Sequence, residues 1–331
     1  MPANCTIMAD IGHSYILKFS LSINLLIAII AIPVLATAGL YLRKKQLFHV
    51  NTRLQIQLQI LALIMHCVGR LGLHIFDLIN YFSDFKDGCE ILPDFYRCLY
   101  ARGLYNVGMT ITQMCSIALV FERSVALLYS KNYENFSSLF GFFLAFFQLV
   151  LSFCFLFNLY KYAPFEPSQT VVLYYCQTLA SGTGSVWTIN APLYAVMIAQ
   201  VLCRVIFEIL DSINFKMRQA HQNQTLSTRY NLEQGQRSIT TLKIFVNVNT
   251  FFYAFLSIVG TSLHFNAASF TKAHYFAIVE MIHFLPTYGI LLSIYIYWTL
   301  RKLDKSLKSS LTKSIKTNPN MYFEQFNMQV L

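Results

Sequence analysis

Residues 19–42, FSLSINLLIAIIAIPVLATAGLYL, form an unbroken run of 24 residues without a charged side chain, between Lys18 and Arg43. An α-helix rises about 1.5 Å per residue, so roughly 20 apolar residues cross the ~30 Å hydrocarbon layer of a membrane. Inside that layer the backbone must satisfy its own hydrogen bonds, and a helix does so within one segment. The run therefore predicts a transmembrane helix near the N-terminus.

The same pattern recurs along the chain. Charge-free gaps of 19, 26, 37, 28 and 20 residues follow Arg102, Glu134, Glu166, Lys243 and Glu280. A shorter gap of 16 residues after Arg53 continues, with a few ionisable interruptions, to about Tyr81. We expect seven helices, at about 19–42, 54–80, 98–122, 137–160, 188–212, 241–263 and 275–299. The predicted fold class is an all-α integral membrane protein, a seven-transmembrane helix bundle.

The composition excludes several other classes of protein. Hydrophobic residues make up 56% of the 331 residues and charged residues only 12%, whereas soluble domains are about 25% charged. An ordinary soluble enzyme is therefore excluded, and the 15% aromatic content excludes a disordered chain. The sequence contains no P-loop, no His-Glu-x-x-His and no Gly-x-Ser-x-Gly motif. We expect no enzymatic activity, no cofactor and no metal site.

Basic residues are divided unevenly between the two sides of the predicted bundle. Seventeen of the 25 Lys and Arg residues fall in the 43–53, 123–136 and 213–243 loops and the tail from 300, and five fall on the other side. The positive-inside rule places the N-terminus outside and the C-terminus in the cytoplasm. We expect an extracellular N-terminus at 1–18, a transmembrane domain at 19–299 and a cytoplasmic tail at 300–331.

The tail has a pattern of its own. Leucines recur at helical spacing among Lys and Arg residues, which predicts an amphipathic helix at about 300–311 lying on the inner leaflet. The formal charge of +10 fits attraction to anionic membrane lipid. It does not indicate a nucleic-acid partner, because no soluble basic domain is present to bind one.

Four cysteines fall on the predicted outer side, where disulfides persist. They are Cys5, Cys89, Cys98 and Cys176, and four cysteines allow three pairings. We favour a bridge between Cys98 and Cys176, which would tie the long second outer loop over the bundle, with Cys5–Cys89 as its companion. Asn4 begins an Asn-Cys-Thr sequence on the same side and is a candidate glycosylation site.

Ionisable residues inside a membrane are costly and often mark function. Those in the outer half of the predicted bundle are Arg70, His74, Asp77, Arg102, Glu280 and His283. They converge from the second, third and seventh helices and predict a polar ligand pocket, roofed by the Cys176 loop with Trp187 and Asn190 at its rim. The alternative is a structural ion-pair cluster, for example Arg102 with Asp77 or Glu280, that never touches a ligand.

Glu122 and Arg123 end the third predicted helix at the cytoplasmic face. Seven helices with an outside N-terminus are the layout of G-protein-coupled receptors, and an acid followed by Arg here resembles their activation switch. In those receptors the acid holds the Arg at rest and releases it towards the G protein. The alternative is a pair of charges that anchors the helix at the headgroups. Helix seven has Leu285-Pro286-Thr287-Tyr288 in place of Asn-Pro-x-x-Tyr, which argues against the rhodopsin-like class.

Several short elements resemble the nematode serpentine chemoreceptors of the Sra superfamily, most of all class alpha/beta (Srab), with class alpha (Sra) next. They are Asn4-Cys5-Thr6, Leu47-Phe48-His49-Val50-Asn51-Thr52, the paired cysteines Cys89 and Cys98, Glu122-Arg123, and residues 227–234, STRYNLEQ. The resemblance implies a plasma-membrane chemosensory receptor of sensory neurons. It would bind a small-molecule or peptide cue and signal to a heterotrimeric G protein. A channel or transporter without such coupling is the alternative.

Overall fold

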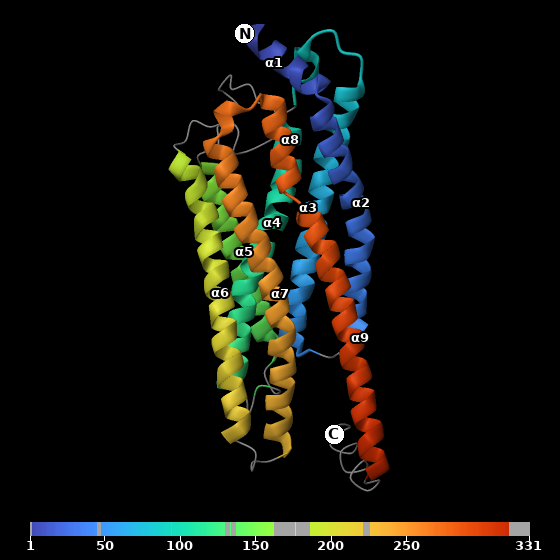
Figure 1. Ribbon diagram of the computed structural model, residues 1–331, viewed down its shortest axis with the longest axis vertical. Helices are drawn as coiled ribbons and strands as arrows, with labels where there is room; N and C mark the ends of the chain where they lie inside the picture. The colour runs from blue at the N-terminus through green and yellow to red at the C-terminus, as the bar shows by residue number, and fades with distance from the viewer. Residues whose placement is uncertain are drawn as a thin grey trace.

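In the computed structural model the chain is described at residues 2–44, 48–93, 95–129, 133, 137–161, 176, 186–220 and 226–317, and all regular structure there is helical. The elements are α1 (Pro2–His13), α2 (Tyr15–Lys44), α3 (Val50–Phe82), η1 (Gly88–Ile91), α4 (Phe95–Leu128), α5 (Ser138–Lys161), α6 (Val186–Ala220), α7 (Leu226–Phe265), η3 (Ala267–Ser269), α8 (Lys272–Ile282) and α9 (Leu285–Thr317). The long helices run side by side as an elongated bundle (Figure 1). Within the described residues, seven segments are long and apolar enough to cross a membrane.

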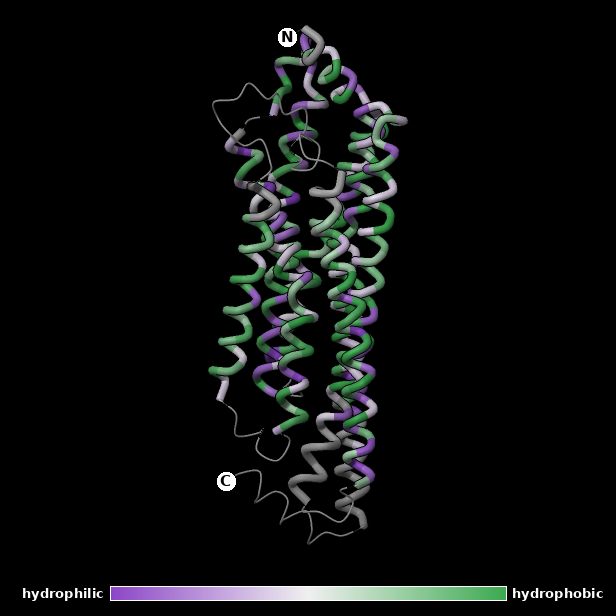
Figure 2. Tube along the Cα trace, turned by 90° about the vertical axis from the view of Figure 1, so that its left-hand side faces the viewer, coloured by the Kyte–Doolittle hydropathy of each residue, from purple (hydrophilic) through white to green (hydrophobic). Residues whose placement is uncertain are grey.

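The bundle is apolar on its outside, and its interior contains buried polar side chains within an apolar core. Large apolar side chains face outwards, including Phe146 on α5, 65% exposed, and Phe251 on α7, 72% exposed. Figure 2 shows hydrophobic residues along the helices for most of the length of the bundle. In contrast Gln55, Gln113 and Asn249 are at most 1% exposed. A lipid environment accounts for both observations, because lipid solvates apolar side chains and leaves polar ones to bond with each other. The protein is a multi-pass membrane protein.

The seventh membrane span is broken between α8 and α9. Helix α8 ends at Ile282 with His283 as its C-cap, and α9 begins at Leu285. His283 and Phe284 therefore lie outside regular helix. Pro286 causes the break, because it has no N–H to donate to the preceding turn and fits the first turn of a new helix. The predicted helix at 275–299 is therefore two helices. The break changes the direction of the chain two residues after Ile282.

Helices α3 and α4 pack so closely that glycine is required on both. A Cβ placed on Gly69 of α3 would lie 2.5 Å from the Tyr105 backbone nitrogen. A Cβ on Gly108 of α4 would lie 2.4 Å from the Ala62 carbonyl oxygen. Small residues let membrane helices approach backbone to backbone. This contact brings the polar side chains of α3 and α4 within reach of one another.

The N-terminal residues form a helix of their own, α1, which the sequence did not predict. It lies obliquely at one end of the bundle (Figure 1), with Met8 and Ile11 fully buried. A disulfide joins Cys5 of α1 to Cys89 of η1, with Cα atoms 4.8 Å apart. The second disulfide joins Cys98 to Cys176, with Cα atoms 5.1 Å apart. Both pairings are those favoured above, and we call this end of the bundle the disulfide end.

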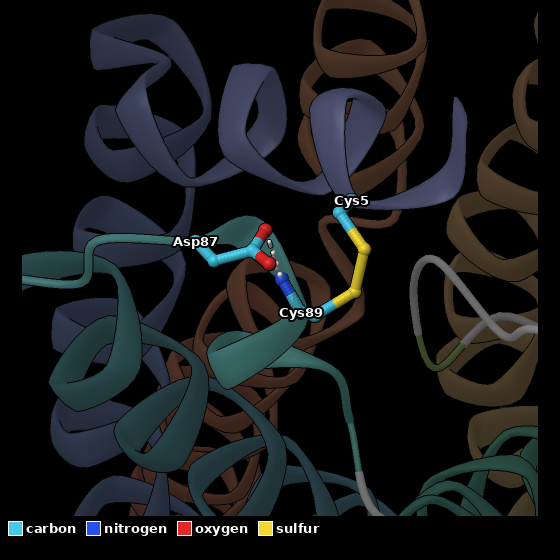
Figure 3. Close-up of side chains that lie close together, drawn as sticks. All are labelled: Cys5, Asp87 and Cys89. Atoms are coloured by element: carbon cyan, nitrogen blue, oxygen red, sulfur yellow. Dashed lines mark hydrogen bonds between the residues drawn. A yellow bond between two sulfur atoms is a disulfide. The ribbon is translucent and has the colours of Figure 1, made fainter. Parts of the chain in front are cut away.

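Figure 3 shows the first disulfide with its neighbour Asp87, whose Oδ1 accepts a hydrogen bond of 3.2 Å from the Cys89 N–H. That bond caps the start of η1. The ligand atoms of Cys5, Asp87 and Cys89 lie within 4.8 Å of one another. Both sulfur atoms are in the disulfide, however, and thiolate is the form of cysteine that binds a metal. The group is therefore a cap and a crosslink.

Three helices extend farthest beyond the ends predicted for the spans. Helix α6 continues to Ala220, α7 begins at Leu226, and α9 continues to Thr317. The amphipathic segment predicted at 300–311 lies within α9, which is drawn as one continuous rod in Figure 1. The reason is that no Pro or Gly follows Gly289 before residue 317, so nothing interrupts the helix after the apolar span.

Candidate functional site

Four ionisable side chains meet inside the bundle in the half nearer the disulfide end. Arg70 and His74 come from α3, Arg102 from α4 and Glu280 from α8, and we call them the Glu280 cluster. All four are buried, and Arg102, the most accessible, is 6% exposed. The spacing of four puts Arg70 and His74 on one face of α3. The tight contact of α3 with α4 then brings Arg102 to the same place.

Glu280 is the one carboxylate of the cluster, and three nitrogen-bearing groups share it. Its Oε2 lies 3.4 Å from Arg70 Nη2 and 3.4 Å from His74 Nε2, and its Oε1 lies 3.4 Å from Arg102 Nη2. Charge-assisted hydrogen bonds are shorter, at about 2.8 Å. The carboxylate is therefore spread over three partners and is close to none of them.

The two guanidinium groups find further partners around one tyrosine. Arg70 donates through Nη1 to Asn24 Oδ1 at 2.9 Å and through Nη2 to the Tyr105 hydroxyl at 3.3 Å. The Cζ atoms of Arg70 and Arg102 lie 5.4 Å and 4.8 Å from the centre of the Tyr105 ring. Arg102 Nε also donates to the Cys176 carbonyl oxygen. The second disulfide thus holds a backbone oxygen against the cluster.

Asn24 links the cluster to α2. Its Nδ2 donates to the Glu280 backbone carbonyl at 3.0 Å, while its Oδ1 accepts from Arg70. One turn away, Ser20 Oγ donates to the Ala277 carbonyl at 3.1 Å. Sequence reasoning missed Asn24, although a single amide in an otherwise charge-free apolar run was the available signal. The amide fixes α8, and so Glu280, against α2.

Two more histidines, His66 and His283, lie beside the cluster. Their hydrogen bonds described here go to backbone carbonyl oxygens. His66 Nδ1 lies 3.0 Å from the Tyr105 carbonyl oxygen, and the two rings are 4.0 Å apart. His283 Nδ1 lies 2.7 Å from the Val279 carbonyl oxygen, where it caps the end of α8. His283 follows the last residue of α8, Ile282, and lies three positions after Glu280.

Of the two partners suggested for Arg102, the structure has Glu280, and Asp77 pairs with Arg97 instead. Asp77 Oδ1 accepts from Arg97 Nη2 at 2.7 Å, whereas Arg102 lies with Glu280. Sequence reasoning missed Arg97 because it placed residue 97 in a loop. The helix α4 begins at Phe95, so Arg97 lies in its first turn, against α3. The Asp77–Arg97 pair thus lies beside the Glu280 cluster, near Arg102 and Glu280.

Three other candidate residues have a helical backbone but side chains outside the described part of the structure. Trp187 and Asn190 lie in the first turns of α6, and Asn4 lies in α1 next to the disulfide-bonded Cys5. The structure therefore neither brings their side chains to the Glu280 cluster nor separates them from it. Glycosylation of Asn4 and a rim formed by Trp187 and Asn190 stay predictions.

A second buried polar group lies at the opposite end of the bundle. We call it the Glu122 cluster. Its members are Thr52 of α3, Glu122 and Arg123 of α4, Ser238 of α7, and Tyr133, which lies between α4 and α5. Glu122 is fully buried and Arg123 is 4% exposed. Glu122 accepts from Arg123, from the Tyr133 hydroxyl and from Thr52 Oγ1, the last at 2.9 Å. Both charges are thus enclosed by neighbouring helices of the bundle.

Arg123 connects three helices. Its Nη1 donates to Ser238 Oγ on α7 at 3.0 Å, and its Nη2 donates to Thr52 Oγ1 on α3 at 2.6 Å. Burial raises the pKa of the Tyr133 hydroxyl, and the Glu122 carboxylate raises it further. Tyr133 therefore keeps its proton and donates to Glu122. Thr52, Tyr133 and Ser238 were not singled out from the sequence, although Thr52 ends the 47–52 element.

The other polar residues of the 47–52 element also have structural partners. His49 is the N-cap of α3, and its side chain accepts a hydrogen bond of 3.3 Å from the Asn51 N–H. Its ring lies 4.4 Å from that of Tyr133. Asn51 Oδ1 accepts from the Gly141 N–H at 3.2 Å. A Cβ on Gly141 would lie only 2.7 Å from the same oxygen. The element therefore joins α3 to α5 beside the Glu122 cluster.

Buried amides fill the bundle between the two clusters. Gln59 Nε2 donates to the Tyr288 hydroxyl at 2.8 Å and joins α3 to α9. Asn249 Nδ2 of α7 donates to Ser116 Oγ of α4 at 2.6 Å and to Gln200 Oε1 of α6 at 3.2 Å. Each of these bonds crosses between helices. These amides therefore tie the helices together in the part of the bundle between the two clusters.

Comparison with known proteins gives one family. The model of the serpentine seven-transmembrane G-protein-coupled receptors of class ab, which are chemoreceptors, matches residues 2–331. Serpentine receptor class beta-2 of Caenorhabditis elegans is 33% identical over 148 residues, which cover 42% of this chain and 41% of that protein. Serpentine receptor class beta-1 of the same organism is 26% identical over 200 residues, covering 59% and 56%. The chain thus spans about half the length of these two relatives.

Proposed function

Because this chain belongs to the class ab family of serpentine chemoreceptors, as its motifs predicted, we propose that it binds a chemical cue near the Glu280 cluster and signals to a heterotrimeric G protein at the Glu122 cluster. The family is one of receptors, which does not favour the channel or transporter alternative. The cue would be a volatile, water-soluble or peptidic molecule from the environment or from another cell.

The proposal includes an orientation. The disulfide end faces the outside, since disulfides persist in oxidising compartments, and most Lys and Arg residues then face the cytoplasm. The plasma membrane of sensory neurons is the proposed location, in keeping with a chemoreceptor family. Protease applied to intact cells should leave a tag at the C-terminus uncut and should remove a tag at the N-terminus. Cutting at the C-terminus would overturn the orientation.

One observation carries the coupling proposal: the buried Glu122–Arg123 pair bonds α4 to Ser238 of α7. In the proposed mechanism this bond holds the cytoplasmic ends of α4 and α7 together at rest. Binding of the cue shifts the bundle towards a state in which the bond is broken and Arg123 can reach the G protein. A ligand shifts such an equilibrium only as far as it binds the two states with different affinity.

Helix α4 provides a direct connection between the two clusters. Arg102 and Arg123 are 21 residues apart on it, which is about 30 Å of helix. Helix α7 is tied to α6 near its cytoplasmic end, where Lys243 pairs with Glu208 and lies 3.2 Å from Asp211 Oδ2. We therefore expect α6 and α7 to move together when the bond to Arg123 breaks.

The function is tested by expressing the full chain in cells with a G-protein reporter and screening odorants, water-soluble metabolites and peptides. A response that disappears in cells lacking the chain and is blocked by inhibiting G proteins supports the proposal. Recording from the same cells separates the alternative. A cue-gated current that persists when all G-protein signalling is blocked would show a channel and would overturn the proposal.

A further inference from the structure

Helices α2 and α9 lie together at the end of the bundle away from the disulfides. The ring centroids of Tyr41 on α2 and Tyr297 on α9 are 5.0 Å apart. Leu42 and Leu300, close to these rings in the sequence, are fully buried. Both helices run away from the disulfide end here (Figure 1). The contact therefore sets the last turn of α2 level with the part of α9 that follows Tyr297.

Five basic side chains follow this contact, and we call them the α2–α9 basic group. All five are exposed, two at the end of α2 and three on α9: Arg43, Lys44, Arg301, Lys302 and Lys305. No ion pair joins them to an acidic side chain within the described part of the structure. The two helices contain one acidic residue between them, Asp304, whose side chain lies outside that part. Five cations and this one carboxylate leave four positive charges in excess.

Aromatic side chains mark the level of the tyrosine contact as the membrane surface. Along α9 the exposed apolar side chains of Leu291 and Ile294 are followed by exposed Tyr297 and Trp298, and then by the cations. Tyr and Trp gather at the headgroup level of membranes. The Nζ of Lys302 lies 5.2 Å from the centre of the Trp298 ring, a cation–π contact that holds the ammonium at that level. The α2–α9 basic group therefore lies against the headgroups of one leaflet.

The group extends farther from the hydrocarbon than a simple headgroup does. At 1.5 Å per residue, Arg43 lies about 3 Å beyond the tyrosine contact, Arg301 about 6 Å and Lys305 about 12 Å. The headgroup layer on each side of a bilayer is about 5–8 Å deep. A headgroup with phosphates at several heights would contact all of these cations, whereas a headgroup with a single phosphate would contact only the nearest of them.

We propose that the α2–α9 basic group binds a phosphoinositide, a lipid of the inner leaflet whose inositol ring carries several phosphates. Clusters of about four to eight Lys and Arg residues directly beyond a membrane helix attract such lipids. Here two helices bring five of them to one place. Arg43 and Arg301 supply planar forks that fit phosphate oxygens. The inference goes beyond the proposed function, because it needs neither a cue nor a G protein.

The test measures lipid binding by the purified full chain in nanodiscs of phosphatidylcholine. The probe is a short-chain fluorescent phosphatidylinositol bisphosphate, and its binding to discs without protein is subtracted. We expect unlabelled phosphatidylinositol bisphosphate to displace the probe, and phosphatidylserine at the same total negative charge to be about ten-fold weaker or worse. Equal displacement by phosphatidylserine would show only general attraction of anionic lipid and would overturn the proposal.

Matched pairs of variants locate the site. Arg43→Gln combined with Arg301→Gln removes one cation from each helix, and we expect the affinity for the probe to fall roughly thirty-fold. Lys216→Gln combined with Arg218→Gln removes the same charge from exposed positions near the end of α6 and should leave the affinity nearly unchanged. An equal loss in both pairs would mean that net charge alone decides, against the proposal. Unchanged affinity in Arg43→Gln alone would also refute it, because α2 would then form no part of the site.

The lipid site and the proposed function fail in different ways. If the probe binds as expected but no cue activates the reporter in cells, the lipid site stands and the receptor function fails. If cues activate the reporter and phosphatidylserine displaces the probe equally well, the receptor function stands and the lipid site fails. All substituted side chains are exposed, so Tm in phosphatidylcholine alone should not change. Should the first pair nevertheless misfold, Lys302→Gln with Lys305→Gln must show the same loss of affinity.

Discussion

The guanidinium of Arg123 on α4 donates to the Ser238 hydroxyl on α7, with 3.0 Å between Nη1 and Oγ. The two residues are 115 positions apart in the chain, and the bond lies at the end of the bundle away from the disulfides. Ser238 is 7% exposed and Arg123 is 4% exposed, so little water can compete for this hydrogen bond. Through this hydrogen bond the Glu122–Arg123 pair of α4 is joined to α7.

Removing the hydroxyl should favour the active state. A hydrogen bond to a charged group contributes about 1.5–3 kcal/mol, so Ser238→Ala should shift the resting equilibrium by roughly ten-fold or more. We expect higher reporter activity without any cue, corrected for the amount of receptor at the cell surface. Ser124→Ala is the matched control, because Ser124 Oγ donates to Val120 of its own helix. Equal basal activity in both variants would refute a role for the Arg123–Ser238 bond.

Neutralising Glu122 should have a larger effect than removing Ser238. Glu122→Gln takes the counter-charge from Arg123 and weakens the bonds from Thr52 and Tyr133, and loss of one partner of a buried ion pair costs about 3–5 kcal/mol. We predict basal signalling above that of Ser238→Ala, measured with the same reporter. Glu90→Gln, at an exposed side chain of η1 at the disulfide end, is the control. A silent Glu122→Gln receptor that reaches the surface in normal amounts would contradict this account.

The glycine contacts between α3 and α4 predict a loss of stability. In Gly108→Ala the new Cβ would lie 2.4 Å from the Ala62 carbonyl oxygen, so the two helices must separate. Such overpacking costs about 1–3 kcal/mol, and Tm of the purified chain should fall. In Gly103→Ala no atom lies within 4 Å of the new Cβ, and alanine favours the helix by about 1 kcal/mol. A variant Gly108→Ala as stable as Gly103→Ala would show that α3 and α4 do not pack this closely.

The two disulfides should differ in what their loss affects. Replacing Cys5 and Cys89 together by Ser frees α1 from η1, and a native disulfide stabilises a fold by about 2–4 kcal/mol. We expect a lower Tm with the response to a cue retained. Replacing Cys98 and Cys176 should lower Tm and also abolish the response, because the Cys176 carbonyl contacts Arg102. An unchanged response without the second disulfide would separate the Cys176 loop from the cue.

Local sequence was sufficient for the seven spans, and it favoured the two cysteine pairs that the structure has. Charge-free gaps locate the seven spans because the length of an apolar helix must match the thickness of the membrane. It was not sufficient for Arg97, which forms an ion pair with Asp77 and was assigned to a loop. Nor did it predict α1, whose 12 residues are too few to cross a membrane and give no hydropathy signal.

The sequence by itself determined that this protein crosses a membrane seven times as helices, because hydropathy acts on each segment separately and needs no neighbours. It also marked Glu280, Arg102, Glu122 and Arg123 as unusual, since charges in apolar segments are costly wherever they lie. Only the tertiary structure decided which charges meet. Glu280 is shared by Arg70, His74 and Arg102, and Arg123 bonds to Ser238, because helix rotation and the glycine contact of α3 with α4 set those distances. Which charged residues pair depends on packing between helices that are distant in the sequence. The hydrophobic periodicity of a single helix does not contain that information.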